Sequence, residues 1–320
     1  MCIRDRAGTP QIKTTLILKC LSLYQHKLDL LAINEEKDVR LSSATSLFFP
    51  RQYLRDQAIQ QVKTHLKQYD YLPLINMDLP ASVHKWATYA QARFSFDFEL
   101  SHQVIQQLTP QEIIGGRTTF QVWKREIMEL KNGNGLLKEL YWNARIKYKQ
   151  GAYVDFLTRF FRVVEELAKS TAVSLLGGFI FSHGTWGIKI KELLDLPVYQ
   201  PLANHLQSKK KNGRKLNYQS PNITTFKAII EFYQTQHPAL YQFLKQVESL
   251  TELRNHSIGA HAFEPVSNTI INQTLKQANT SMTKIFAFLD EQLEPLTKNA
   301  FDKVNMQIIH LLGAQKHGIV

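Results

Sequence analysis

Residues 238–261 read PALYQFLKQVESLTELRNHSIGAH, and this stretch predicts a helix that leads into a functional site. Apolar residues recur every three or four positions, which is the spacing of one buried face of an amphipathic helix. They are Leu240, Phe243, Leu244, Val247, Leu250 and Leu253. Pro238 suits the first turn of such a helix, because the N–H that proline lacks has no partner there. We therefore expect one helix over residues 238–258.

Arg254 stands where the helical phase calls for an apolar side chain. Continuing at about 100° per residue places Arg254 in the middle of the apolar face, with His261 on the same side and His256 opposite. A guanidinium cannot shed its charge, so its burial is costly unless it is paired or used. A fixed cation with a titratable imidazole is what metal-free RNA cleavage needs. A structural salt bridge, or a helix end that reaches solvent, would explain the same pattern.

Composition narrows the possible partners. The 320 residues contain 39 Lys and Arg against 27 Asp and Glu, a net charge of +12 that favours a polyanion, and nucleic acid first. Cys2 and Cys20 are too few for a disulfide scaffold or a four-cysteine zinc site, so we expect a cytoplasmic protein with no metal. The longest apolar stretch, residues 171–181, is too short to span a bilayer, and we expect no membrane partner.

The N-terminal region predicts part of an α/β unit. Residues 1–6, MCIRDR, look like a non-native leader, because they resemble translated adaptor DNA and are too polar for a signal peptide. The loop Gly8, Thr9, Pro10 and Gln11 then opens a helix that is followed by a strand-type run over residues 28–34. A loop at a helix N-terminus suits a phosphate or a nucleotide edge. A plain helix cap by Thr9 explains the loop about as well.

From Pro50 onward the pattern is almost wholly helical, so the fold class is mainly α. Besides 238–258 we expect helices over residues 53–69, 82–108, 120–130, 135–149, 154–176, 223–234 and 268–289. Pro73 and Pro80 interrupt the helical pattern, and we expect a domain boundary between these two prolines. We therefore expect the C-terminal part of a Rossmann-like α/β domain with a connecting helix over residues 7–75, and an all-helical domain over residues 76–320.

One segment concentrates positive charge. Residues 196–230 contain no acidic residue but carry Lys209, Lys210, Lys211, Arg214, Lys215 and Lys227. A solvated, mobile loop from Ser208 is one interpretation. A loop that follows the phosphates of a nucleic acid, with Tyr218 stacked on a base, is the other.

The order of these features resembles the CARF–HEPN ancillary ribonucleases of type III CRISPR systems, which join a Rossmann-fold sensor (CARF) domain to a helical ribonuclease (HEPN) domain. The resemblance covers nearly the whole chain from Ala7, but only the last portion of the CARF domain, so it implies an N-terminally truncated fragment. It implies catalysis by Arg254, Asn255 and His261, the HEPN motif of an Arg, a polar residue and a His.

The resemblance also implies a function. Gly8, Thr9, Pro10 and Gln11 would bind a cyclic oligoadenylate activator, and a homodimer would cleave single-stranded RNA in antiviral defence without metal or other cofactor, leaving 2′,3′-cyclic phosphate ends. A non-catalytic helical module that binds nucleic acid is the alternative from another class. A HEPN ribonuclease of the toxin type, without nucleotide control, is a third.

Overall fold

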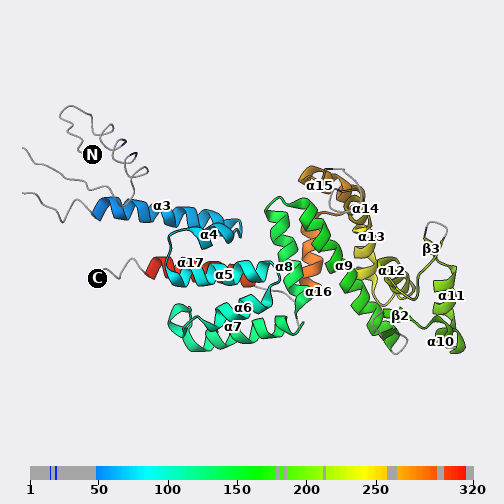
Figure 1. The fold of residues 1–320 in the computed structure, drawn as a ribbon. Helices are drawn as coiled ribbons and strands as arrows, with labels where there is room; N and C mark the ends of the chain where they lie inside the picture. Colours follow the sequence, from blue (N-terminus) through cyan, green and yellow to red (C-terminus); the bar gives the residue numbers. More distant parts are fainter. Residues whose placement is uncertain are drawn as a thin grey trace, which may run out of the picture.

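The computed structural model describes residues 48–133, 135–177, 180–182, 186–211, 214–257, 265–293 and 299–314, together with Thr15 and Lys19. The predicted leader and most of the predicted CARF portion, residues 7–75, lie outside these ranges. In the described part the chain is mainly helical, as the sequence predicts (Figure 1).

The elements before the centre of the molecule are α3 (Phe48–Lys67), α4 (Leu72–Asn76), α5 (Ala81–Phe94), α6 (Phe98–Gln106), the 3-10 turn η2 (Pro110–Glu112) and α7 (Gly116–Lys131). The centre is formed by the helical hairpin of α8 (Leu136–Lys149) and α9 (Tyr153–Leu176). The remaining helices are α10 (Ile190–Asp195), α11 (Gln200–Ser208), α12 (Ile223–Phe232), α13 (Pro238–Gln246), α14 (Glu248–His256), α15 (Asn268–Gln277), α16 (Met282–Gln292) and α17 (Ala300–Ala314).

Strands in the described residues are confined to two short antiparallel hairpins. β1 (Ile180–Ser182) pairs with β2 (Trp186–Ile188), and β3 (Lys210–Lys211) pairs with β4 (Arg214–Lys215). From the sequence, the glycines around Trp186 predict a turn between packed helices. That prediction is wrong, because the segments on either side, Ile180–Ser182 and Trp186–Ile188, are paired antiparallel strands and not helices.

The buried apolar side chains form two clusters. The first, which we call the α5 core, lies among α3 to α7 and α17 and includes Trp86, Trp123 and Phe301. The second, the α9 core, lies among α8 to α16 and includes Phe156 and Phe243. Helix α8 contributes to both clusters, so the hairpin α8–α9 is the element on which the two halves meet (Figure 1). The predicted domain boundary near residue 75 stays a prediction.

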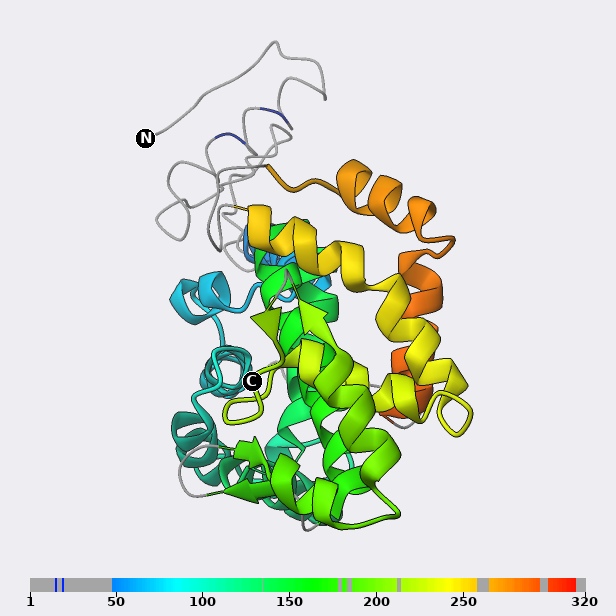
Figure 2. The ribbon, with the colours of Figure 1, turned by 90° about the vertical axis from the view of Figure 1, so that its right-hand side faces the viewer.

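Three predicted helices are interrupted. The helix expected over residues 82–108 is two helices, because Ser95 to Asp97 form a turn and the Asp97 side chain caps α6 by accepting from the Leu100 N–H. The helix expected over 268–289 breaks between α15 and α16, where the Ser281 side chain caps α16. The helix expected over 238–258 begins at Pro238 as predicted but bends at Val247, and α14 ends at His256 (Figure 2).

Candidate functional site

Arg254 lies in the last turn of α14, against the long helix α9. Its guanidinium carbon is 4.8 Å from the centre of the Phe161 ring of α9, which is cation–π distance. The side chain is half-buried rather than enclosed in the apolar core. Arg254 follows the buried Leu250 by one helical turn and precedes the buried Ser257, so it lies on the buried side of α14, the side that the sequence predicts, although the helix is interrupted at Val247.

In the described structure, the hydrogen bonds of Arg254 leave some N–H groups of its guanidinium without a partner. Nη1 donates to Oδ1 of the neighbouring Asn255 at 3.2 Å. Nε is buried and has no hydrogen-bond partner among the described residues. Burying an N–H without an acceptor costs free energy, and an anion bound against the guanidinium would remove that cost. The guanidinium of Arg254 is therefore suited to bind a phosphate group.

The end of α14 is closed by Ser257. Its hydroxyl donates to the Arg254 carbonyl at 2.7 Å, and its backbone N–H donates to the same oxygen at 3.2 Å. Ser257 is 1% exposed, whereas Asn255 and His256 are exposed. This cap fixes the backbone of the last turn, which carries Arg254, and the helix ends here because Ser257 adopts an extended conformation.

Carboxylates of α9 do not neutralise Arg254 in the described structure. Of the three acidic residues of this helix, Glu165 forms an ion pair with Arg162 and Glu166 with Lys169, and Asp155 pairs with Lys147 and Arg159. Among the described residues no carboxylate pairs with Arg254. A structural salt bridge to one of these glutamates therefore does not account for this arginine.

The other predicted site residues cannot be placed. His261 lies outside the described residues, and so do Gly8, Thr9, Pro10 and Gln11. The structure thus brings together Arg254 and Asn255 of the predicted motif and leaves the position of the imidazole open. His256, the other imidazole of this segment, is exposed at the end of α14.

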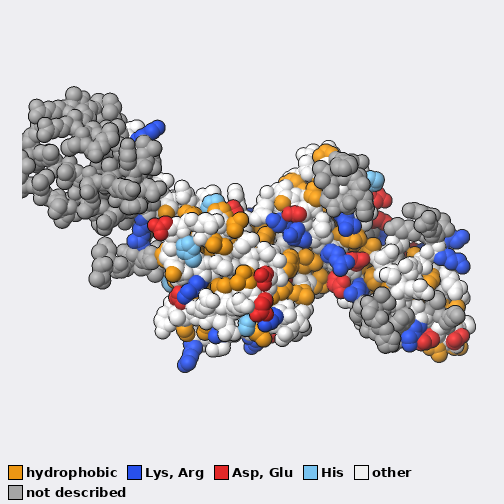
Figure 3. All heavy atoms as spheres, in the orientation of Figure 1, with side chains coloured by type: hydrophobic (Ala, Val, Ile, Leu, Met, Phe, Trp, Pro, Cys, Tyr) orange, Lys and Arg blue, Asp and Glu red, His pale blue; other side chains and the backbone are white. Residues whose placement is uncertain are grey.

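The basic segment, residues 196–230, contains the short β3–β4 hairpin. Lys210, Lys211, Arg214 and Lys215 belong to the β3–β4 hairpin, and Lys and Arg side chains mark that end of the molecule (Figure 3). Tyr218 is half-buried, and its hydroxyl donates to the Leu206 carbonyl at 2.6 Å. Its ring packs against the α9 core, so stacking on a base is not supported.

Sequence reasoning missed Phe161 and Ser257 as parts of this site. Phe161 follows Phe160 in a strongly apolar helix. The local sequence does not distinguish a ring that packs in the core from a ring that contacts a guanidinium. Ser257 directly follows the arginine motif, and a serine at the end of a predicted helix could have been recognised as a capping residue.

The described residues hold neither a membrane span nor a metal-binding cluster. None of their helices is long and apolar enough to cross a membrane. Within the same residues, no group of three or more His, Cys, Asp or Glu side chains is arranged to hold a metal ion.

A half-satisfied arginine at the end of a capped helix, in a basic helical domain, has the chemistry that phosphate contacts require. Comparison with known families is more specific. Residues 131–309 match the family model described as the Csm6 HEPN domain of CRISPR-associated proteins, and the chain belongs to this family. The resemblance to CARF–HEPN ribonucleases is confirmed.

A solved structure agrees with this assignment at the level of fold. Csm6 of Enterococcus italicus, bound to cyclic hexa-2′-fluoro-hexa-dAMP, is similar with a TM-score of 0.51 and 15% sequence identity. The match covers 95% of this chain and 73% of that chain. Among curated proteins no significant match to this sequence was found. The chain is thus a Csm6-like protein with a HEPN ribonuclease domain.

Proposed function

We propose that the chain is an endoribonuclease that cleaves single-stranded RNA without a metal ion, with Arg254, Asn255 and His261 as catalytic residues. The observation that supports this most directly is the state of Arg254. It is held over the Phe161 ring and against Asn255, and among the described residues its Nε has no hydrogen-bond partner and no carboxylate neutralises it.

The chemistry follows from these groups. The 2′-hydroxyl of the RNA attacks the adjacent phosphorus in line, the bond to the 5′-oxygen of the next nucleotide breaks, and the products are a 2′,3′-cyclic phosphate and a 5′-hydroxyl. The forked guanidinium of Arg254 stabilises the charge that grows on the phosphoryl oxygens. An imidazole has an unperturbed pKa of about 6.5, so His261 is suited to move the proton.

A homodimer completes the site in this proposal. If the helix continued unbroken, Arg254 and His261 would be about 10 Å apart along its axis, which is too far to share one phosphate. Helix α14 ends at His256 instead, so the following chain can turn back. A second copy would bring its own Arg254 and His261 to the same cleft, and two motifs facing each other would supply enough groups for one reaction.

Regulation by a cyclic oligoadenylate is the remaining part of the proposal. It rests on the loop Gly8 to Gln11 and on family membership, and the structurally similar Enterococcus italicus protein was solved with a cyclic hexanucleotide bound. Binding would take place at the N-terminal loop, and the expected role is in antiviral defence.

The test is cleavage of a labelled single-stranded RNA with and without cyclic tetra- and hexa-adenylate, in EDTA. We expect activity that depends on one of the activators, products with cyclic phosphate ends, and loss in Arg254→Ala and His261→Ala. Two matched controls are Arg125→Ala, an exposed arginine of α7 paired with Glu129, and His256→Ala.

Each outcome has a separate meaning. Cleavage that persists in both Arg254→Ala and His261→Ala contradicts the site. Loss in His256→Ala with retention in His261→Ala would reassign the imidazole. Cleavage that ignores every cyclic oligoadenylate removes the activator and leaves the toxin-type ribonuclease, and RNA binding without cleavage supports the non-catalytic module.

A further inference from the structure

A pocket of about 720 Å³ lies where the two halves of the molecule meet, and we call it the junction pocket. Its walls come from the turn after α3, the turn after α5, the end of α8 and the start of α9. Gln150 Nε2 donates to the Gln68 carbonyl at 2.6 Å and ties the first of these turns to α8. A volume of this size is ordinary for a small-molecule site.

The charge of this pocket is positive. Lys147, Lys149 and Arg159 line it, together with the single acidic residue Asp70. Lys147 and Arg159 also share one carboxylate, that of Asp155, at 3.9 and 3.6 Å. Burial, followed by the nearby Arg159 guanidinium, lowers the pKa of Lys147. The cations are therefore incompletely neutralised by the protein itself.

Arg159 also has a buried N–H group whose hydrogen bond is not satisfied within the described residues. Its Nη1 donates to the Asp155 carbonyl at 3.2 Å, but its Nε is buried without a hydrogen-bond partner among the described residues. Buried guanidinium N–H groups are normally satisfied, and an incoming anion is the acceptor that suits them best.

Aromatic rings accompany the cations. Lys147 lies over the Phe94 ring at 4.8 Å, and Lys149 lies over the Tyr69 ring at 4.9 Å. Phe96 also lines the pocket. Alternation of cations with ring faces is how proteins hold a phosphate and the base attached to it, because bases stack on aromatic rings while cations hold the phosphate.

The backbone of the pocket is unusual at two of these aromatic residues. Tyr69 and Phe96 have φ angles of 54° and 62°, and in the described chain the only other non-glycine residue with positive φ is Asn279. Both residues follow the end of a helix, where the left-handed position is usually glycine. Strained residues gather at ligand sites, and here two of them place aromatic rings beside the same cavity.

We propose that the junction pocket binds the phosphate group of a nucleotide between Lys147, Lys149 and Arg159, with the attached base against the aromatic wall. Arg159 and Phe161 are two residues apart on α9, so they lie on roughly opposite sides of the helix. The pocket is therefore a site separate from Arg254, and it does not depend on the proposed cleavage.

The test measures binding to the full chain by calorimetry. The probes are the four ribonucleoside 5′-monophosphates, a single-stranded 2′-O-methyl RNA decamer that cannot be cleaved for lack of a free 2′-hydroxyl, and inorganic phosphate alone. We expect saturable nucleotide binding that weakens at least tenfold in Arg159→Gln and in Lys149→Glu. Lys149 is exposed, so its replacement leaves folding intact.

A matched control is Lys124→Gln, because Lys124 also lies over a ring, that of Phe120 at 4.3 Å, but outside the pocket. Unchanged binding in Lys124→Gln supports the proposal. Binding of monophosphates identifies a free nucleotide, and binding of the decamer alone identifies a strand. The proposal is overturned if no probe binds saturably, if both pocket variants bind as the parent does, or if inorganic phosphate binds as tightly as the nucleotides.

Discussion

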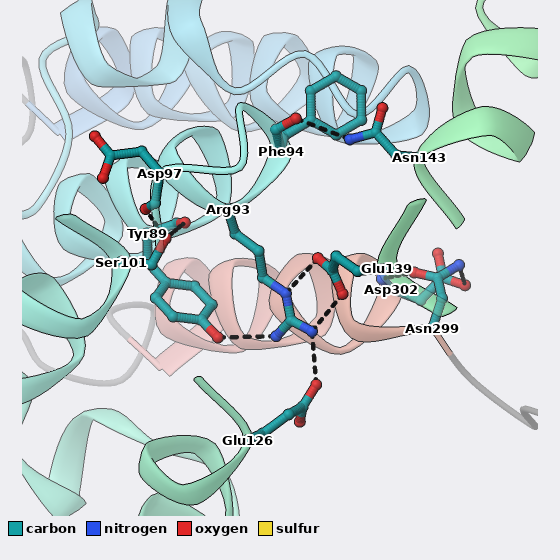
Figure 4. A network of polar contacts seen from close by, with 10 residues as sticks. All are labelled: Tyr89, Arg93, Phe94, Asp97, Ser101, Glu126, Glu139, Asn143, Asn299 and Asp302. Carbon is teal, nitrogen blue, oxygen red and sulfur yellow. Dashed lines mark hydrogen bonds and ion pairs between the residues drawn. The ribbon is translucent and has the colours of Figure 1, made fainter. Parts of the chain in front are cut away.

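Two arginines of this protein show how differently one side chain can be used. Arg93 of α5 is 2% exposed and donates to both oxygens of Glu139 at 2.6 and 2.7 Å, to Glu126 at 2.7 Å and to the Tyr89 hydroxyl at 2.9 Å (Figure 4). Burial would lower the pKa of Arg93, but the Tyr89 oxygen and the two carboxylates raise it well above its usual value. Every nitrogen of this guanidinium thus donates to an oxygen of the protein itself.

Arg254 is the opposite case. Among the described residues its side chain has one hydrogen bond, to its neighbour Asn255, a ring beneath it and a buried Nε without a partner. The comparison teaches that the number of satisfied donors, more than burial, separates an arginine that holds the fold from one that is available for chemistry.

The largest effect should come from replacing Arg93, the arginine whose hydrogen bonds are made within the protein. Arg93→Met leaves Glu139 buried without its cation, and removal of one partner of a buried ion pair costs about 3–5 kcal/mol. We expect that loss in the free energy of unfolding, measured by urea denaturation. The double variant Arg93→Met with Glu139→Leu should recover part of it. A loss below about 1 kcal/mol would show that the pair is not coupled to the core.

Replacing the unsatisfied arginine should act on activity instead. Arg254→Lys keeps the positive charge but loses the planar guanidinium with its paired N–H donors. The cleavage rate should therefore fall about 100-fold. The melting temperature should stay within error of that of the parent. RNA cleavage under single-turnover conditions is the measurement. A stability loss as large as that of Arg93→Met would make Arg254 a structural residue and erase the contrast.

The ring beneath Arg254 should have a smaller effect. A cation–π contact at a partly exposed site is worth about 0.5–1 kcal/mol, so Phe161→Leu should lower the cleavage rate roughly two- to fivefold. Phe161→Tyr keeps a ring at that place and serves as the control. Equal rates in the two variants would mean that the ring does not position the guanidinium.

An effect of similar size, here on stability at neutral pH, should come from Tyr69, another satisfied group of the α5 core. Its hydroxyl donates to Asp302 Oδ1 at 2.6 Å, and burial and this carboxylate raise the pKa of Tyr69 to about 12. A raised folded pKa means that stability is complete below the unfolded value of about 10 and is lost as pH rises toward 12. Tyr69→Phe should cost about 1 kcal/mol at pH 7.

The pH dependence supplies the control for this variant. Between pH 10 and 12 the free energy of unfolding should fall less steeply in Tyr69→Phe than in the parent, because one titrating group has been removed. Parallel slopes would mean that another tyrosine, such as Tyr141, whose pKa burial also raises, dominates the alkaline loss.

Much of the helical content could be predicted because apolar periodicity reports it directly. Helices α7, α8, α9 and α12 fall close to their predicted ranges. The interruptions at Phe96 and Val247 were missed because the apolar spacing continues across each of them, and no glycine or proline marks the break. Helix α17 was missed although Phe301, Val304 and Ile308 have helical spacing.

The sites were predictable to different degrees. Arg254 could be singled out because a charge broke an apolar pattern. The Arg93 network could not, since Glu139 is 46 residues away in sequence and only the packing of α5 against α8 brings them together. The junction pocket was beyond sequence reasoning for the same reason: its cations lie on α8 and α9, and its rings follow α3 and α5.

Helix α17 has a consequence for the order in which the chain folds. It packs against α5 and α3, and Asn305 and Asp302 bond to the Tyr71 and Tyr69 hydroxyls, which are 234 and 233 residues earlier. The α5 core is therefore incomplete until residues 300–314 have been synthesised. The helices between α7 and α17, which carry Arg254, can pack first, so the earliest helices of the described chain should be among the last to become stable.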